Sequence, residues 1–327
     1  MTDKKKWKSR LLSSSIPLEF EVAKALSNLN FNVSFDYAYY RQENGVSKEF
    51  STDIKGFLLF PRNNENKVNA NLNILAECKY REEEKKWAFL PEVNRPDISH
   101  FTLGYTFKSL SEFSIVKNYK DHIYAFEGKF NFALKGVEIS LSTGEVYDKD
   151  IRHGIMQLQY ALPYILKSDI EGNLFGFLED SDPTYTISVL VTNADLYIFN
   201  EDFSIERMKN IDDLDSIAKK VPYLICSSEI GPDFTQHHKS IFKNFCLLNE
   251  YESNLNTFEA FQKKQIHKKL QIYNSPIDTC NDLAESSYYI LRKYYSQHFV
   301  CSFEHFPQFM EELVKVVSKV TKVRNKK

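Results

Sequence analysis

The sequence predicts an α/β protein with a mixed β-sheet flanked by helices. Two apolar runs with strand-like alternation, residues 48–60 and 72–79, follow a stretch with helical spacing at 16–29. A second helical stretch, 151–162, precedes an apolar, β-branched run at 186–199. This order of helix, strands, helix and strand is typical of a sheet with helices packed on it.

The first helical stretch and the late apolar run can each be predicted in more detail. Helical spacing in the first stretch gives a core face of Val22, Ala25, Leu26 and Leu29, and a turn at Asn30 leads into a strand. The run at 186–199 predicts a buried strand, a turn near Asn193 and a second strand.

The two early strands bring charged side chains toward one place. Successive side chains of a strand alternate between faces, so Glu77 and Lys79 point to one face of the later strand. Its other face is apolar and carries Ile74, Ala76, Cys78 and Tyr80. Asp53 shares a face of the earlier strand with Lys55. If the strands pair as a hairpin, Asp53, Glu77 and Lys79 converge.

Two carboxylates and an ammonium are suited to holding a divalent metal and activating water. Mg²⁺ takes oxygen ligands, usually one or two carboxylates with water and substrate phosphate, and Mn²⁺ can substitute. Asp53 and Glu77 would supply carboxylates, and the carbonyl of Cys78 a third oxygen. Lys79 would contact the attacking water or the scissile phosphate. The metal would lower the pKa of its water and neutralise charge on a phosphodiester.

Asp53 followed by Glu77-Cys78-Lys79 resembles the signature of the PD-(D/E)XK phosphodiesterase superfamily, which has the restriction-endonuclease-like fold. The resemblance implies a metal-dependent nuclease, acting on DNA rather than RNA, in restriction and defence or in repair. It also implies a supporting Glu on the helix before the first core strand, which is Glu19 here, with Glu21 as the fallback. Thr52 stands where the superfamily has Pro, a loss that bears little on metal binding.

A further resemblance involves the helix at 151–162. Some subgroups carry a Gln and a Tyr on this helix, near the metal and the phosphate. Gln157 with Tyr160, or Gln159, matches that pattern, and Gln157 is the predicted site residue.

Other interpretations compete with the nuclease. Glu77 and Lys79 could form the solvated face of an ordinary hairpin. The same fold could serve as a catalytically silent module that binds nucleic acid or a partner protein. A helical interaction scaffold with an incidental α/β part is a third interpretation.

The sequence divides into two predicted parts. Residues 1–230 are the predicted nuclease-like domain, with a β-rich insertion at about 81–150 that serves as a substrate clamp or as fold-specific padding. Its strand-like pieces are residues 121–126, 130–134 and 137–141. Residues 231–327 form a predicted helical subdomain, whose last apolar stripe suits core packing or a dimer seam.

Composition limits the remaining function classes. With 43% hydrophobic and 14% aromatic residues, the chain can bury a large core and is not disordered. The 42 basic and 44 acidic residues are nearly balanced, so a nucleic-acid interface must come from local charge, such as the basic residues at both ends of the chain.

A homodimer would suit double-strand cutting.

Motifs that are absent from the sequence exclude further classes. No phosphate-binding G-x-x-x-x-G-K-[ST] loop occurs, so an intrinsic ATPase is not expected. No long apolar run predicts a membrane span, and the basic start lacks an apolar signal core. Five cysteines without C-x-x-C spacing argue against a disulfide scaffold or a zinc ribbon and fit a reducing cytoplasm.

Overall fold

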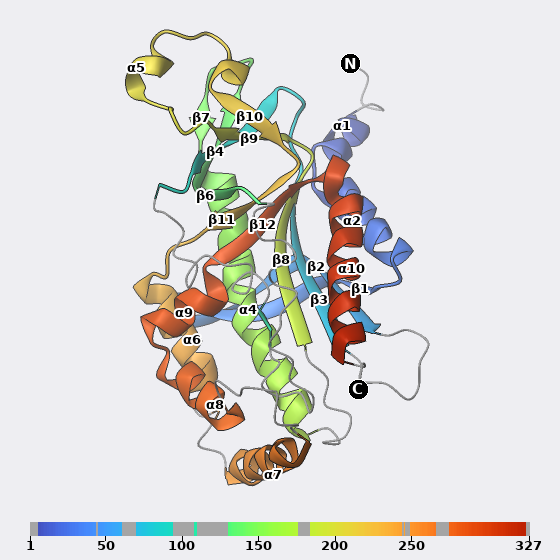
Figure 1. Cartoon of the computed structure of the whole chain (residues 1–327). Coiled ribbons are helices and arrows are strands. Elements are labelled where there is room, and N and C mark those ends of the chain that lie inside the picture. Colours follow the sequence, from blue (N-terminus) through green and yellow to red (C-terminus); the bar gives the residue numbers. More distant parts are fainter. Residues whose placement is uncertain are drawn as a thin grey trace.

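A computed structural model describes residues 6–43, 45–60, 70–93, 108–109, 130–175, 184–243, 245, 249–265 and 275–324. These residues form a mixed α/β fold around one twelve-stranded sheet, as the sequence predicts (Figure 1). The sheet holds antiparallel and parallel strand pairs, and helices cover both of its faces.

The sheet runs through ten strands in a single path. Its first half is β1 (Asn32–Glu43), β2 (Val46–Phe60), β3 (Ala70–Lys79), β8 (Thr184–Thr192) and β12 (Gln297–Ser302). Its second half is β11 (Tyr223–Ser227), β6 (Phe132–Ser140), β4 (Lys85–Pro91), β9 (Asp195–Phe199) and β10 (Ala218–Val221). Two short strands lie off this path, β5 (Lys108–Ser109) beside β8 and β7 (Val146–Tyr147) beside β6.

The strands β1, β2 and β3 form an antiparallel meander, and β3 pairs in parallel with β8. In the register of β2 with β3, Ile54 lies opposite Ala76. This register places the apolar alternate residues of both strands on one face, as predicted. The other face of β3 carries Leu75 into the opposite core. Both faces of β3 are therefore buried, and burial is almost continuous along the strand even at its polar residues Asn73 and Glu77.

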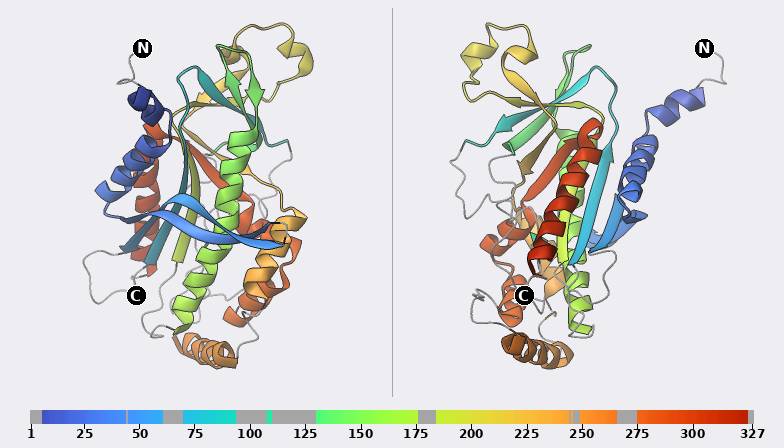
Figure 2. Two further views of the ribbon diagram at one scale, coloured as in Figure 1. Left: turned by 180° about the vertical axis from the view of Figure 1, so that it is seen from behind. Right: turned by 45° about the vertical axis from the view of Figure 1, so that its right-hand side comes forward.

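One long helix, α4 (Lys149–Phe175), covers the first face of the sheet. Its apolar stripe packs Leu158, Leu162 and Ile165 into a core shared with Leu75 of β3 and Leu190 of β8. Figure 2 shows the hairpin of β1 and β2 crossing over α4. The hydroxyl of Tyr164 on α4 donates to the carbonyl of Tyr40 on β1, at 3.0 Å.

The second face is covered by α2 (Ile16–Asn28) and α10 (Phe306–Arg324), which lie beside each other (Figure 1). Val22 and Leu26 of α2 are fully buried, and Ala25 and Leu29 pack at the edge of the same core, as predicted. The apolar stripe of α10 is buried here too, through Phe309, Met310, Leu313, Val316 and Val317. Core packing therefore accounts for that stripe.

The remaining helices lie at the two ends of the molecule. The short helix α1 (Lys6–Leu12) precedes α2, and α5 (Ile205–Met208) follows β9. Four helices from the C-terminal part pack near α4 and one another: α6 (Pro232–Phe242), α7 (Asn249–Gln265), α8 (Pro276–Glu285) and α9 (Tyr288–Tyr295).

The described part of the predicted insertion supplies extra strands, as its sequence predicts: β4, β6 and β7 extend the sheet beyond β11, and β5 pairs with β8. The structure differs from the sequence prediction in two other places. Residues 130–141 give one strand, β6, where two were expected, and residues 121–126 lie outside the described residues. Residues 231–327 were expected to be helical, but they contain β12, which pairs with β8 and β11 in the middle of the sheet.

Candidate active site

The ends of β2 and β3 position the first carboxylate of the site. Continuing the strand register by one step from the pair Ile54–Ala76 places Asp53 opposite Glu77. The backbone N–H of Cys78 donates to Oδ2 of Asp53 at 2.6 Å. Burial raises the pKa of Asp53, while this bond from Cys78 and the charge of Lys79 act to lower it. Asp53 is therefore held against the strand that carries the other two predicted residues.

Glu77 is the most deeply buried member of the site, with 1% of its surface exposed. Its Oε1 accepts a hydrogen bond from Nζ of Lys79 at 2.7 Å, while Oε2 is buried and has no hydrogen-bond partner among the described residues. Burial and the negative charge of Asp53 raise the pKa of Glu77 to about 7. The interpretation of Glu77 as part of a solvated hairpin face is therefore wrong.

The third predicted residue, Lys79, links β3 to α4. Its ammonium also donates to Oε1 of Gln157 at 3.2 Å, and Nε2 of Gln157 donates to the carbonyl of Ser51 at 3.3 Å. Gln157 thus holds Lys79 from the helix side and ties α4 to β2. The helix comes this close because Gly154 has no side chain: a Cβ there would lie 2.6 Å from Cδ1 of Leu190 and 3.4 Å from Cε of Lys79.

The structure separates the two glutamines that matched the family pattern. Gln159 points to the other flank of α4, where its Nε2 donates to Ser228 Oγ and to the carbonyls of Glu229 and Tyr295. Tyr160 donates its hydroxyl to Asp233 on α6. Of these residues, Gln157 alone contacts Lys79 in the described part of the chain.

Glu19 approaches the site from α2. Burial raises its pKa, and the negative charges of Asp53 and Asp36 raise it further, while Lys79 lowers it. Glu19 therefore lies within electrostatic reach of the site residues. The fallback candidate, Glu21, instead forms an exposed ion pair with Lys24.

Two residues at the site were not predicted. Asp36 falls between the pairs Phe35–Ile54 and Tyr37–Thr52, which places it across from Asp53, and its φ of 54° lies in the left-handed region that Asp tolerates better than most residues. His153 lies one helical turn before Gln157; burial and the charge of Lys79 lower its pKa. Its spacing of four residues from Gln157 was the available clue.

Cys78 contributes through its main chain. Its side chain is buried in the core beneath α2 and α10, and burial raises the pKa of the thiol well above its usual value. The predicted metal contact through its carbonyl stays a prediction. The buried thiol takes no part in the site.

The donor set fits a magnesium ion of the kind that keeps most of its water. Asp53 and Glu77 are neighbouring carboxylates of raised pKa, and Glu77 has a buried oxygen without a partner. Within the described part of the chain, no three His, Cys, Asp or Glu side chains are grouped to hold a metal by themselves. Mg²⁺ does not need such a cage, because one or two carboxylates with water and phosphate suffice.

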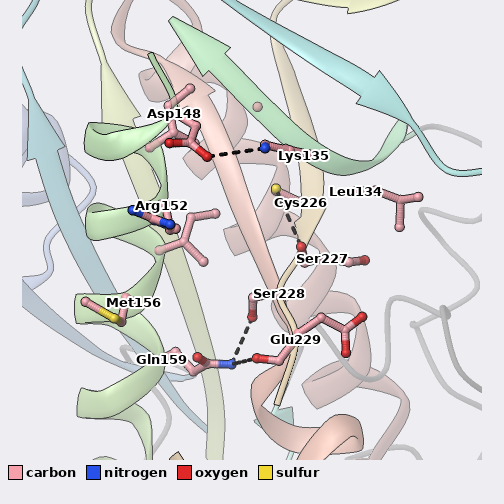
Figure 3. A pocket seen from close by; sticks show the side chains of 13 residues that line it. Leu134, Lys135, Asp148, Arg152, Met156, Gln159, Cys226, Ser227, Ser228 and Glu229 are labelled. Carbon is pink, nitrogen blue, oxygen red and sulfur yellow. Dashed lines mark hydrogen bonds and ion pairs between the residues drawn. The ribbon is translucent and has the colours of Figure 1, made fainter. Parts of the chain in front are cut away.

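A separate cavity of about 430 Å³ lies on the other flank of α4 (Figure 3). Arg152, Met156 and Gln159 line it from the helix, and Ser227 and Ser228 line it from the end of β11. None of the five predicted catalytic residues, Glu19, Asp53, Glu77, Lys79 and Gln157, lines this cavity. The carboxylate site and the cavity therefore use opposite flanks of one helix.

Comparisons with protein-family models, with curated proteins and with solved structures gave no match to this chain. Among the helices of the described residues, none combines the length and the apolar character needed to cross a membrane. Function therefore has to be argued from the site itself.

Proposed function

We propose that the protein is a Mg²⁺-dependent nuclease with a restriction-endonuclease-like core, and that it hydrolyses phosphodiester bonds in DNA. The observation that carries the proposal is the unpartnered Oε2 of Glu77, buried beside a second carboxylate, Asp53, with Lys79 bound to the other oxygen. A buried acid with a free oxygen is costly to ionise unless a cation compensates it. A divalent ion between Asp53 and Glu77 would provide that compensation.

Each residue of the site has a distinct task. Asp53 and Glu77 would hold the metal, with the Cys78 carbonyl as a third oxygen, and Glu19 would support the same ion or a second one. When bound, the metal lowers the pKa of a water molecule and offsets negative charge on the phosphate. Lys79, held by Glu77 and Gln157, presents its ammonium to the attacking water or a phosphate oxygen. Gln157 positions Lys79 and need not contact the substrate.

The test measures cleavage of supercoiled plasmid, linear duplex, single-stranded DNA and RNA, each with Mg²⁺, Mn²⁺ or EDTA. Asp53→Ala and Lys79→Ala accompany the wild type. Asp169→Asn, which changes a partly buried acid on α4 away from the site, is the matched control. We expect metal-dependent cleavage that disappears in the first two variants and persists in the control. Binding without cleavage under every condition would instead assign the silent nucleic-acid-binding module.

A further inference from the structure

The helix α1 has a surface that the fold does not use. None of its residues is buried, and Trp7 exposes 63% of its surface. Figure 2 shows α1 projecting away from the body of the molecule. A seven-residue helix gains little stability by itself, so an unpacked α1 is weakly held until something binds to it.

The attachment of α1 is nevertheless well defined. The hydroxyls of Ser13 and Ser14 donate to the carbonyls of Arg10 and Leu11, which caps the last turn of the helix. The next residue, Ser15, accepts a hydrogen bond from the backbone N–H of Tyr80 at 3.4 Å, directly after Lys79 on β3. The base of α1 therefore lies at the end of the strand that carries Glu77 and Lys79.

The charge of α1 identifies the kind of partner. Its seven residues include Lys6, Lys8 and Arg10 and no acidic residue, in a chain that is otherwise nearly neutral. Lys8 and Arg10 are exposed and flank the exposed indole of Trp7. Cations beside an exposed aromatic ring match a nucleic-acid strand, since the cations contact phosphates and the ring stacks on a base.

We propose that α1 is a substrate-binding arm, in which Trp7 stacks on a base of the nucleic acid while Lys8 and Arg10 contact its phosphates. The inference rests on the proposed nuclease and adds the surface that holds the strand beside the metal site. A helix of seven residues is about 10 Å long, which covers roughly three nucleotides of a strand. The apolar residues that continue from Trp7, such as Leu11, are exposed as well and enlarge the contact surface.

The chain supplies its own reporter for this contact. It has two tryptophans, Trp7, which is exposed, and Trp87, which is fully buried beneath Arg81. In EDTA, where no cleavage occurs, titration with a 20-nucleotide single strand and with the matching duplex should quench the emission of Trp7. The variant Trp7→Phe keeps Trp87 alone, so we expect no quenching from it and weaker binding by fluorescence anisotropy.

The contribution of the α1 cations to nucleic-acid binding is tested by the double variant Lys8→Glu/Arg10→Glu. We expect affinity to fall at least tenfold at low salt, with the slope of log affinity against log salt reduced by about 2 for the two lost phosphate contacts. The matched control is Lys209→Glu/Lys219→Glu, which reverses two exposed lysines after β9 and on β10. We expect the control to bind nearly as the wild type does.

Failure of the arm and failure of the nuclease give different results. Metal-dependent cleavage with unchanged Trp7 emission and full affinity in Lys8→Glu/Arg10→Glu would overturn the arm and leave the nuclease. Quenching with no cleavage under any condition would support the arm and count against the nuclease. A mass that doubles in solution and returns to the monomer in Trp7→Ala would show that a second copy covers α1, which also overturns the proposal.

Discussion

Two acids of raised pKa lie between α4 and the sheet, Glu77 buried and Asp169 partly buried, and their surroundings differ. Glu77 projects from β3, and Asp169 projects from α4 two turns beyond the centre of the helix. Burial raises the pKa of each to about 7. At Asp169 the remaining influences all favour the charged form: the positive charge of Lys55 and hydrogen bonds from Asn73 and Thr186. At Glu77 the next influence after burial is the like charge of Asp53, which raises the pKa further, while the charge and hydrogen bond of Lys79 and the backbone of Asp53 lower it.

This difference separates a structural acid from a candidate metal ligand. The fold surrounds Asp169 with a cation and hydrogen-bond donors that lower the cost of its burial. Glu77 has Lys79 on one oxygen, no hydrogen-bond partner on the other and a second carboxylate nearby. A raised pKa alone would therefore rank the two acids equally, and the identity of the neighbours distinguishes them.

Replacing Glu77 should lower the rate of DNA cleavage far more than replacing Asp169, and this is the largest difference expected between the two acids. We expect Asp53→Asn and Glu77→Gln each to lower the rate of DNA cleavage by about 10³-fold or more, because each removes a ligand from the metal that stabilises the transition state. Asp169→Asn should cleave within about threefold of the wild type. The measurement is single-turnover cleavage of a fluorescent duplex in Mg²⁺. Equal losses in Glu77→Gln and Asp169→Asn would remove the distinction.

Stability against pH should also distinguish them. Both acids have folded-state pKa values above their unfolded values, so the folded protein binds more protons and stability is lost as pH rises from about 4 through 7. Each acid contributes roughly 3 to 4 kcal/mol to this loss. Mg²⁺ should restore the part that comes from Glu77 and leave the part that comes from Asp169, because the ion would compensate only the carboxylates of its own site. Urea unfolding at pH 5, 6, 7 and 8, with Mg²⁺ and with EDTA, measures it.

Two variants separate the contributions of Glu77 and Asp169 to the pH dependence of stability. In EDTA, Glu77→Gln and Asp169→Asn should each flatten part of the pH dependence. Mg²⁺ should stabilise Asp169→Asn at pH 8 as much as the wild type and should stabilise Glu77→Gln much less, because that variant keeps Asp53 as the remaining carboxylate between the two strands. Stabilisation of Glu77→Gln by Mg²⁺ to the same extent as the wild type would place the ion elsewhere in the molecule.

The sequence predicts the part of the site that lies on β2 and β3, because that part depends on strand alternation and on the order of the elements. The faces of β2 and β3 follow from period-two alternation, so the proximity of Asp53, Glu77 and Lys79 could be predicted once the strands were assumed to pair. Gln157 could be named only through a family pattern, which did not distinguish it from Gln159. The crossing of α4 decides between them, and that crossing depends on Gly154 and Leu190, which are distant in sequence.

The missed features depend on long-range pairing. Asp36 is one polar residue within a strand, and its place across from Asp53 follows from the register of β1 with β2. The strand β12, sequence QHFVCS, follows directly on a helix, and its apolar residues could equally continue a helical pattern. Partners from β8 and β11 stabilise it as a strand, and sequence periodicity carries no information about those partners.

One amide side chain lies beside Lys79 and another beside Asp169, and their removal should have different effects. Gln157 accepts from Lys79, and Asn73 donates to Asp169 at 3.0 Å. We expect Gln157→Ala to lower cleavage about tenfold with less than about 1 kcal/mol lost in unfolding free energy, since it misplaces a catalytic ammonium that is still partly exposed. Asn73→Ala should lower the unfolding free energy by about 1 to 3 kcal/mol and leave cleavage nearly unchanged, because the partly buried Asp169 loses a hydrogen-bond donor. The reverse pattern would exchange the roles of the two regions.

Two glycines of α4 give the smallest expected effects and a matched pair of variants. Gly154 lies at the Glu77 end, where an added Cβ would lie 2.6 Å from a methyl carbon of the buried Leu190, and Gly172 lies near Asp169 with nothing within 4 Å of its added Cβ. Gly172→Ala should stabilise the protein by about 0.5 to 1 kcal/mol through helix propensity. Gly154→Ala has the same propensity gain but must displace Leu190, so we expect a net loss of about 1 to 2 kcal/mol.

Cleavage assays on this pair show whether the packing of α4 also sets the geometry of the site. The added Cβ of residue 154 would lie 3.4 Å from Cε of Lys79, so the shift that relieves Leu190 also moves the helix away from the ammonium. Gly154→Ala should therefore lower the cleavage rate several-fold while Gly172→Ala keeps it. Urea unfolding and single-turnover cleavage measure the two effects separately. If both variants gain stability equally, Leu190 repacks freely and the close approach of α4 to β3 does not depend on a missing side chain.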